Sequence, residues 1–159
     1  KRRMTASLLV MRHGEKSGDP LDPHLTPAGT ARANKLAVYI PSVFGIPTFI
    51  FAAANPLHSS RSYETMTPLA DASGVPIDVT FADQDYGALA LSLRTDEKFK
   101  DTIGVVCWHH GNIPSLMNAL LAVEGQYPDP WAQDVFNLIL LAEFGGERAV
   151  SVTQIVQPF

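Results

Sequence analysis

The sequence has a single cysteine, no long apolar run and few charges for its length. Cys107 cannot form an internal disulfide, because the sequence offers it no second cysteine. It lies within the apolar segment 103–108, so we expect a buried side chain rather than a reactive thiol. The first apolar run, residues 8–11, is too short to span a membrane or to form the core of a signal peptide. We therefore expect a cytoplasmic protein, with a removed signal as the alternative.

Positive charge is scarce as well. The 12 Lys and Arg residues are outnumbered by 16 Asp and Glu residues, which gives a net charge of −4. A chain of this charge has no general attraction to nucleic acid or to an anionic membrane, and we expect neither as a partner. An anionic ligand would therefore need a local group of positive side chains.

Length and composition fit one folded domain. The chain has 159 residues, of which 46% are hydrophobic, too many for a disordered protein. No repeat, low-complexity tract or linker divides the sequence, so we expect a single domain over residues 1–159. Met4 is a candidate for the native first residue, with residues 1–3 added ahead of it.

Strand-like and helix-like segments alternate along the chain. Apolar runs predict strands at residues 6–11, 48–54, 76–81 and 103–108. Capping residues and helical spacing predict a helix at residues 27–39, with Thr26 as its cap and Pro41 at its end. Further helices are predicted from Ser59 or Ser60 to residue 72, near residue 95, and from Asn112 to residue 121. Residues 135–142 and 148–156, on either side of Gly145 and Gly146, predict a closing hairpin.

This order of segments predicts an α/β fold. We expect three αβα layers, with a mainly parallel central sheet and a C-terminal antiparallel hairpin. Residues 82–93 give no clear prediction. Phe136 is expected in the core, with the edge of a ligand pocket as the alternative. In open parallel sheets, ligands bind beyond the carboxyl ends of the strands, so we expect a ligand site among the residues that follow each strand.

Basic and imidazole side chains gather at these predicted strand ends. The residues concerned are Arg12, His13, Gly14 and Glu15 after the first strand, Asn55, His58 and Arg61 after the second, and His109, His110 and Gly111 after the fourth. The planar fork of arginine matches two oxygens of a phosphoryl group, and a neutral imidazole is a competent nucleophile. A glycine beside them lets phosphate approach the backbone. The sequence therefore indicates phosphoryl chemistry at one edge of the sheet.

Four segments resemble, in order, the histidine phosphatase (phosphoglycerate mutase-like) superfamily. Arg12-His13-Gly14 after a strand resembles the family signature, and Leu25-Thr26-Pro27-Ala28-Gly29 with Arg32-Ala33 resembles its first-helix pattern. Arg61-Ser62-Tyr63-Glu64-Thr65 resembles the second-arginine segment, usually Arg-Ala-x-Gln-Thr, and Trp108-His109-His110-Gly111 resembles the second-histidine segment. One departure is the loop before Arg61, which lacks the usual Ser-Pro-x-x-Arg spacing.

The resemblance implies a role for each matched residue. His13 becomes phosphorylated, while Arg12, Arg61 and His110 hold the phosphate. His110 is selected because the family's histidine directly precedes the glycine. Strand alternation would turn His109 to the other side, so we expect a packing or supporting role for it.

The proton donor is less well defined by the resemblance. Residues 83–87 can be aligned with a Glu-x-Asp-Tyr-Gly-like context, which places Asp83 where the family's acid stands, with Asp85 or Glu15 as alternatives. A solvated acidic loop is an equal alternative interpretation. Lys16 and His58 are candidates for further substrate contacts, although both residue types are usually solvated in loops.

These features favour hydrolysis of phosphate monoesters, or of phosphohistidine on a partner protein, through a phosphohistidine at His13. Phosphoglycerate mutases of the family carry insertions for which 159 residues leave little room. Mutase-type phosphoryl transfer and a non-catalytic phosphate-binding module are the alternatives. The histidines lack partners at metal-ligand spacing, so we expect neither a metal nor another cofactor.

Overall fold

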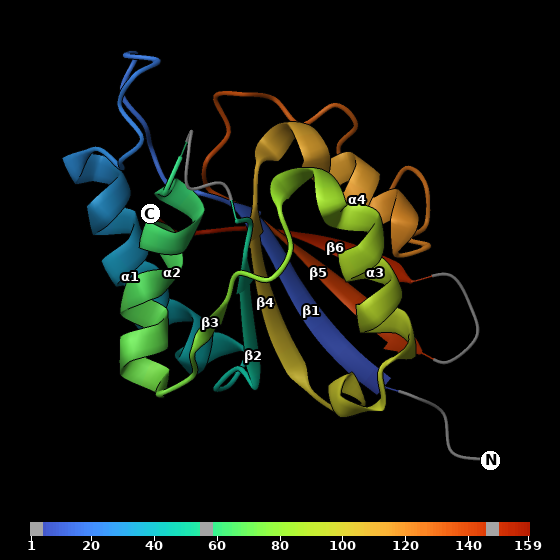
Figure 1. Cartoon of the computed structure of the whole chain (residues 1–159). Coiled ribbons are helices and arrows are strands. Elements are labelled where there is room, and N and C mark those ends of the chain that lie inside the picture. Colours follow the sequence, from blue (N-terminus) through green and yellow to red (C-terminus); the bar gives the residue numbers. More distant parts are fainter. Residues whose placement is uncertain (1–4, 55–58, 146–149) are drawn as a thin grey trace.

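The computed structural model describes residues 5–54, 59–145 and 150–159 (Figure 1). Three expectations fall outside these ranges. They concern Met4 as a first residue, the loop that carries Asn55 and His58, and the turn at Gly146.

A six-stranded mixed sheet forms the centre of the fold, with strand order β3-β2-β4-β1-β5-β6. Its parallel strands are β1 (Thr5–Arg12), β2 (Phe49–Ala52), β3 (Ile77–Asp78) and β4 (Ile103–Trp108). The last two strands, β5 (Leu138–Gly145) and β6 (Ser151–Val156), run antiparallel, β5 against β1 and β6 against β5. The predicted fold class, a mainly parallel sheet with a C-terminal antiparallel pair, is confirmed.

Helices cover both faces of this sheet. Helices α1 (Pro27–Val43) and α2 (Arg61–Ser73) lie on one face, at the left in Figure 1, and α3 (Tyr86–Thr95) and α4 (Ile113–Ala119) lie on the other. Three short 3₁₀ turns complete the structure: η1 (Asp83–Asp85), η2 (Glu97–Phe99) and η3 (His110–Asn112). No helix in the described ranges is long and apolar enough to cross a membrane.

The alternation of side chains along β1 divides the core into two halves. Leu9 and Met11 pack in the half formed with α1 and α2, whereas Leu8 and Val10 pack in the half formed with α3 and α4. All four side chains are buried. Because β1 is buried on both faces, its sequence is a continuous apolar run, and this run leads directly into Arg12 and His13.

Some element boundaries differ from the sequence predictions. Helix α1 continues past Pro41 to Val43, because a proline in the last turn removes only its own N–H. The carbonyl of Pro41 still accepts a hydrogen bond from the N–H of Gly45. Strand β3 has two residues, since the Asp78 side chain accepts a bond from the Thr80 N–H and turns the chain away. The short helix expected near residue 95 is η2, with Asp96 as its cap.

Candidate active site

The carboxyl ends of β1 and β4 lie side by side at the upper edge of the sheet in Figure 1, where Arg12 pairs with Trp108. His13 follows β1, and His110 begins η3 just beyond β4. Arg61 begins α2, the helix that packs beside these ends. The positive charges of both Arg12 and Arg61 act on His13, so the three side chains lie within electrostatic reach of one another.

His13 is buried, with 3% of its surface exposed. Its Nδ1 lies 2.7 Å from the carbonyl oxygen of Gly14. A carbonyl only accepts hydrogen bonds, so this contact requires a proton on Nδ1 and leaves the lone pair on Nε2. Burial, reinforced by the charges of Arg12 and Arg61, lowers the pKa of His13 to about 3. The imidazole is therefore neutral at pH 7, with Nε2 ready to act as a nucleophile.

Arg12 has two hydrogen-bond donors that remain without a partner. The residue is 2% exposed, and its guanidinium lies 3.9 Å from the centre of the Phe136 ring and donates from Nη1 to the carbonyl of Gln133 at 2.6 Å. Nε and Nη2 are buried and have no partner in the described parts of the chain. Burial lowers the pKa of Arg12 to about 10, which still leaves it charged at pH 7. Unpaired donors on a buried cation are the arrangement that an oxyanion would satisfy.

Arg61 is held in place by the loop ahead of α1. It donates from Nε to the carbonyl of His24 at 3.3 Å, from Nη1 to Ser59 Oγ at 3.3 Å, and from Nη2 to the carbonyl of Asp22. A guanidinium has five N–H groups, so the contacts with described residues leave one on each terminal nitrogen for a ligand.

His110 contributes a second neutral imidazole. Burial, followed by the charge of Arg12, lowers its pKa to about 4, and its Nδ1 is buried without a described partner. The ring of His109 lies against it, with centroids 4.7 Å apart. The expectation that strand alternation would turn His109 away from His110 is wrong, because the strand ends at Trp108 and the chain coils into η3.

Gly14 is fixed on both sides by hydrogen bonds within the protein. Its N–H donates to Thr65 Oγ1 at 2.9 Å, and this hydroxyl donates to the carbonyl of Arg61 at 2.7 Å. Its carbonyl accepts from His13. Gly14 was expected to contact phosphate, but both of its backbone polar groups are already in use. What it does in the structure is orient His13 and tie the loop to α2.

Glu15 pairs with Arg32 of α1 through two hydrogen bonds, each 2.9 Å long. Arg32 also donates to Gln157 Oε1 at 2.9 Å and to the carbonyl of Phe159 at 2.7 Å. The hydrogen bond from Arg32 is the main cause of a lowered pKa at Glu15. A carboxylate held in its charged form is a poor proton donor, which leaves the two aspartates of η1 as candidates.

Asp83 is anchored at the edge of the site, whereas Asp85 is exposed. The carbonyl of Asp83 accepts from Trp108 Nε1 at 3.0 Å, and its Oδ2 accepts from Asn112 Nδ2 at 2.8 Å. Its Oδ1 is buried without a partner in the described residues. Burial lowers the pKa of His109, and the negative charge of Asp83 opposes this shift, so the carboxylate lies within electrostatic reach of His109.

Lys16 is exposed at the other margin of the site. Its backbone forms an isolated bridge with Leu25, and its charge acts on both His109 and His110. It is thus within reach of a ligand. His58, the other candidate for an additional contact, lies outside the described residues.

Three residues support the site in ways that the sequence did not predict. The carbonyl of Gln133 and the ring of Phe136 position Arg12, although Phe136 was expected in the core. Asn112 was expected to cap α4, but its side chain makes no capping bond and holds Asp83 instead. No periodic pattern marks residues 130–137, so nothing in the sequence links this loop to Arg12.

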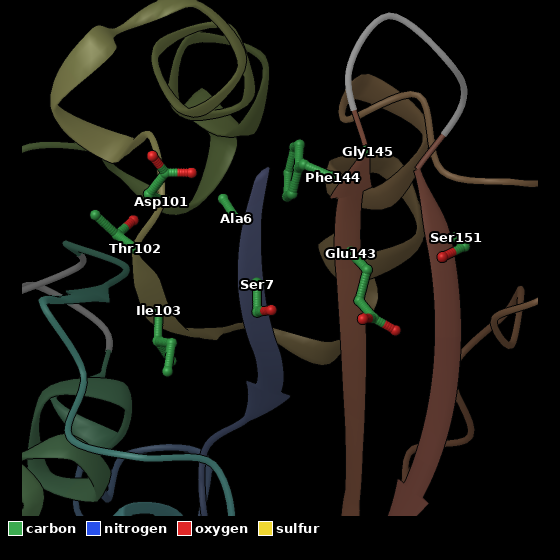
Figure 2. A pocket seen from close by; sticks show the side chains of 9 residues that line it. All are labelled: Ala6, Ser7, Asp101, Thr102, Ile103, Glu143, Phe144, Gly145 and Ser151. Atoms are coloured by element: carbon green, nitrogen blue, oxygen red, sulfur yellow. The ribbon is translucent and has the colours of Figure 1, made fainter. Parts of the chain in front are cut away.

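A different hollow lies at the opposite end of β1, with a volume of about 450 Å³ (Figure 2). Its described lining includes Ser7, Asp101 and Glu143, and neither an arginine nor a histidine. Two carboxylates would repel phosphate, so this hollow does not match the chemistry of the strand ends. Nor do the described residues contain a group of three or more His, Cys, Asp or Glu side chains that could hold a metal ion.

No family model matches the sequence, and no curated protein matches it. Solved structures do share its fold. The protein histidine phosphatase SixA, solved with tungstate, matches with a TM-score of 0.69 and 16% identity, over 94% of this chain and 96% of that one. A mycobacterial glucosyl-3-phosphoglycerate phosphatase matches with a TM-score of 0.65 and 16% identity, over 96% and 98%. A phosphoserine phosphatase mutant from Entamoeba histolytica matches with a TM-score of 0.61 and 18% identity, over 92% and 94%.

Proposed function

Since the chain has the fold of the histidine phosphatases and phosphoglycerate mutases, we propose that it is a phosphatase of the histidine phosphatase superfamily. In this proposal it hydrolyses phosphate monoesters, or phosphohistidine, through a covalent phosphohistidine on His13. The four ordered sequence motifs and the shared fold both support the assignment.

One observation carries the proposal. A neutral, buried His13, with its lone pair on Nε2, lies within electrostatic reach of Arg12, whose buried Nε and Nη2 have no partner in the described residues. Anion binding alone does not require a neutral imidazole with a fixed tautomer, whereas nucleophilic attack does. The arrangement therefore favours catalysis over a non-catalytic phosphate-binding module.

In the first step, the substrate phosphate binds to the free donors of Arg12 and Arg61 and to His110. Nε2 of His13 attacks phosphorus as the bond from phosphorus to the leaving oxygen breaks. Asp83, which must carry a proton for this step, gives that proton to the leaving oxygen, and the alcohol departs. The carbonyl of Gly14 stabilises the positive charge that develops on the ring of His13.

In the second step, a water molecule attacks the phosphorus of the phosphohistidine. The carboxylate of Asp83 takes a proton from the water as the phosphorus–nitrogen bond breaks, which restores the lone pair of His13. Inorganic phosphate leaves, and each group has regained its starting protonation. Positioning and electrostatic stabilisation supply most of the rate enhancement in such transfers.

The substrate is either a small phosphomonoester or phosphohistidine on a protein. SixA is described as a protein histidine phosphatase, whereas the other two related structures are phosphatases of small phosphorylated molecules.

The test is to trap the phosphoenzyme. The protein is mixed with an aryl phosphate, quenched in alkali because phosphohistidine is labile to acid, and digested for mass spectrometry. We expect a phosphoryl group on the peptide that contains His13, and no such peptide or phosphate release in the His13→Ala variant. The His109→Asn variant is the matched control, and its label should remain on His13.

Other outcomes would point to the alternatives. Equal phosphate release by His13→Ala and the parent would refute the nucleophile assignment. Phosphate binding without hydrolysis of any aryl, alkyl or protein-bound phosphate would favour a binding module. Transfer of the phosphoryl group to an added alcohol in preference to water would favour mutase-type chemistry.

A further inference from the structure

A groove leads from the candidate active site between α4 and residues 129–133. Its volume is about 780 Å³, within the usual range for ligand sites. Its polar lining side chains are those of Tyr86, His110, Ser115, Asn118, Asp129 and Gln133.

The groove is continuous with the phosphate site at two points. His110 lines it, and the ring of His110 lies within the electrostatic reach of Arg12. Gln133 also lines it, and the carbonyl of the same residue accepts the hydrogen bond from Arg12 Nη1. A phosphate held by Arg12 and His110 would therefore place its leaving group at the mouth of the groove.

Apart from Asp129, the polar side chains of this groove are neutral and can form hydrogen bonds with a ligand. Tyr86, Ser115, Asn118 and Gln133 have side chains with no hydrogen-bond partner in the parts of the chain that the structure describes. Hydroxyl and amide groups both donate and accept. This combination matches the hydroxyl groups of a polyol or sugar, which also donate and accept.

The charge of the lining discriminates against acidic leaving groups. Among the described lining residues there is no lysine or arginine, and Asp129 contributes a carboxylate. A second phosphate or a carboxylate on the substrate would lose hydration in the groove and face Asp129 without a cation to pair with.

We propose that this groove binds the leaving group of the substrate, and that it selects a neutral, hydroxyl-rich leaving group such as a sugar over one with a further acidic group. The inference rests on the proposed phosphatase function, because it concerns the group that leaves phosphorus.

A matched pair of substrates tests the selection. α-D-Glucose 1-phosphate and α-D-glucuronic acid 1-phosphate differ only in a hydroxymethyl group against a carboxylate. We expect kcat/KM to be higher for the glucose compound by about tenfold or more, since unfavourable charge in an interface is costly. Equal values, or a preference for the acid, would overturn the proposal.

A positive charge placed in the groove should change the ratio of kcat/KM for the glucose compound to kcat/KM for the glucuronic acid compound. Asn118 is exposed on α4, so Asn118→Lys will fold and adds a cation to the lining. We expect it to narrow the preference by about two- to fivefold, the range for exposed ion pairs. Asn34→Lys is the matched control, because Asn34 is exposed on α1, away from the groove. An equal change in both variants would contradict a role for the groove.

Binding separates this inference from the proposed function. Calorimetry with the His13→Ala variant measures the affinity of both sugar phosphates without turnover. Tighter binding of the glucose compound, with a smaller difference in His13→Ala/Asn118→Lys, supports the groove even if no phosphoenzyme forms on His13 in the parent. No preference in binding overturns the inference, even if the parent proves to be a phosphatase.

Discussion

Gly14 and Gly29 pack backbone against backbone where the His13 loop meets the start of α1. A Cβ on Gly14 would lie 2.9 Å from the carbonyl oxygen of Gly29, and a Cβ on Gly29 would lie 2.5 Å from the carbonyl oxygen of Glu15. Real side chains do not tolerate such distances. The contact therefore fixes the His13 loop against α1, and both positions require glycine for close approach.

We predict that Gly29→Ala destabilises the protein by about 1–3 kcal/mol, the usual range for overpacking. It should also lower kcat/KM by about ten- to hundredfold, because a small displacement of His13 misaligns the nucleophile. Urea denaturation and steady-state kinetics measure the two effects. Gly87→Ala is the matched control, since a Cβ there meets nothing within 4 Å. A stable and fully active Gly29→Ala variant would show that the contact between Gly14 and Gly29 does not hold the His13 loop in place.

The lowered pKa of His13 should make the folded state sensitive to acid. Its pKa is about 3 in the folded protein against an ordinary value of 6.5, so below pH 6.5 the unfolded chain binds a proton that the folded chain does not. The contribution of His13 to stability is therefore fully present above pH 6.5, and it declines as the pH falls towards 3. Between pH 7.5 and 5.0 the loss from His13 is about 2 kcal/mol. We predict that His13→Gln loses less stability than the parent over this interval, as measured by urea denaturation.

His24 provides a control of opposite sign. It is exposed, and its hydrogen bond with Glu64 raises its pKa above 6.5. The contribution of His24 to the stability of the fold is therefore complete below pH 6.5, and it is lost as the pH rises through the pKa of His24 in the folded protein. His24→Gln should keep the acid sensitivity of the parent. If His13→Gln kept it as well, His13 would not be a buried neutral imidazole.

Glu64 positions Arg61 through the loop that holds it. Its Oε1 accepts from the Leu25 N–H at 2.9 Å, and its Oε2 lies 2.5 Å from His24 Nδ1 and accepts from Ser60 Oγ at 2.7 Å. We predict that Glu64→Ala raises KM for an aryl phosphate by about three- to tenfold, the effect of losing one hydrogen bond or two, with a smaller change in kcat.

The conservative variant distinguishes positioning from a general loss of stability. Glu64→Gln keeps an acceptor for the Leu25 N–H, so its KM should stay close to that of the parent. It removes the carboxylate beside His24, so the pKa of His24, followed by NMR titration, should fall towards 6.5. A KM that does not respond to either substitution would argue against this support of Arg61.

Asp83 can be tested as the proton donor by varying the leaving group. An alkoxide needs a proton as it departs, whereas a nitrophenolate does not. Asp83→Asn should therefore slow hydrolysis of an alkyl phosphate by about a hundredfold or more and that of p-nitrophenyl phosphate only a few-fold. Asp85→Asn is the matched control, because this carboxylate is exposed on the same turn. The same selective loss in Asp85→Asn would transfer the role to Asp85.

Much of the architecture follows from local features of the sequence. The apolar runs predict β1 and β4, and the Thr26 cap is confirmed by its 3.1 Å hydrogen bond from the Gly29 N–H. Helix α2 ends at Gly74, whose positive φ is the conformation in which glycine is favoured. Predictions failed where distant contacts decide, as at Asn112, which serves Asp83 and not its own helix.

The sequence by itself determined the order of the strands and helices along the chain except for α3, and it placed Arg12, His13, Arg61 and His110 at the ends or starts of elements on one edge. Apolar periodicity, capping residues and the topology of parallel sheets contain that information. Only the tertiary structure decided the protonation of His13, the pairing of Glu15 with Arg32, and the support of Arg12 by Gln133 and Phe136. These depend on burial and on contacts between residues far apart in the chain, which no local pattern encodes.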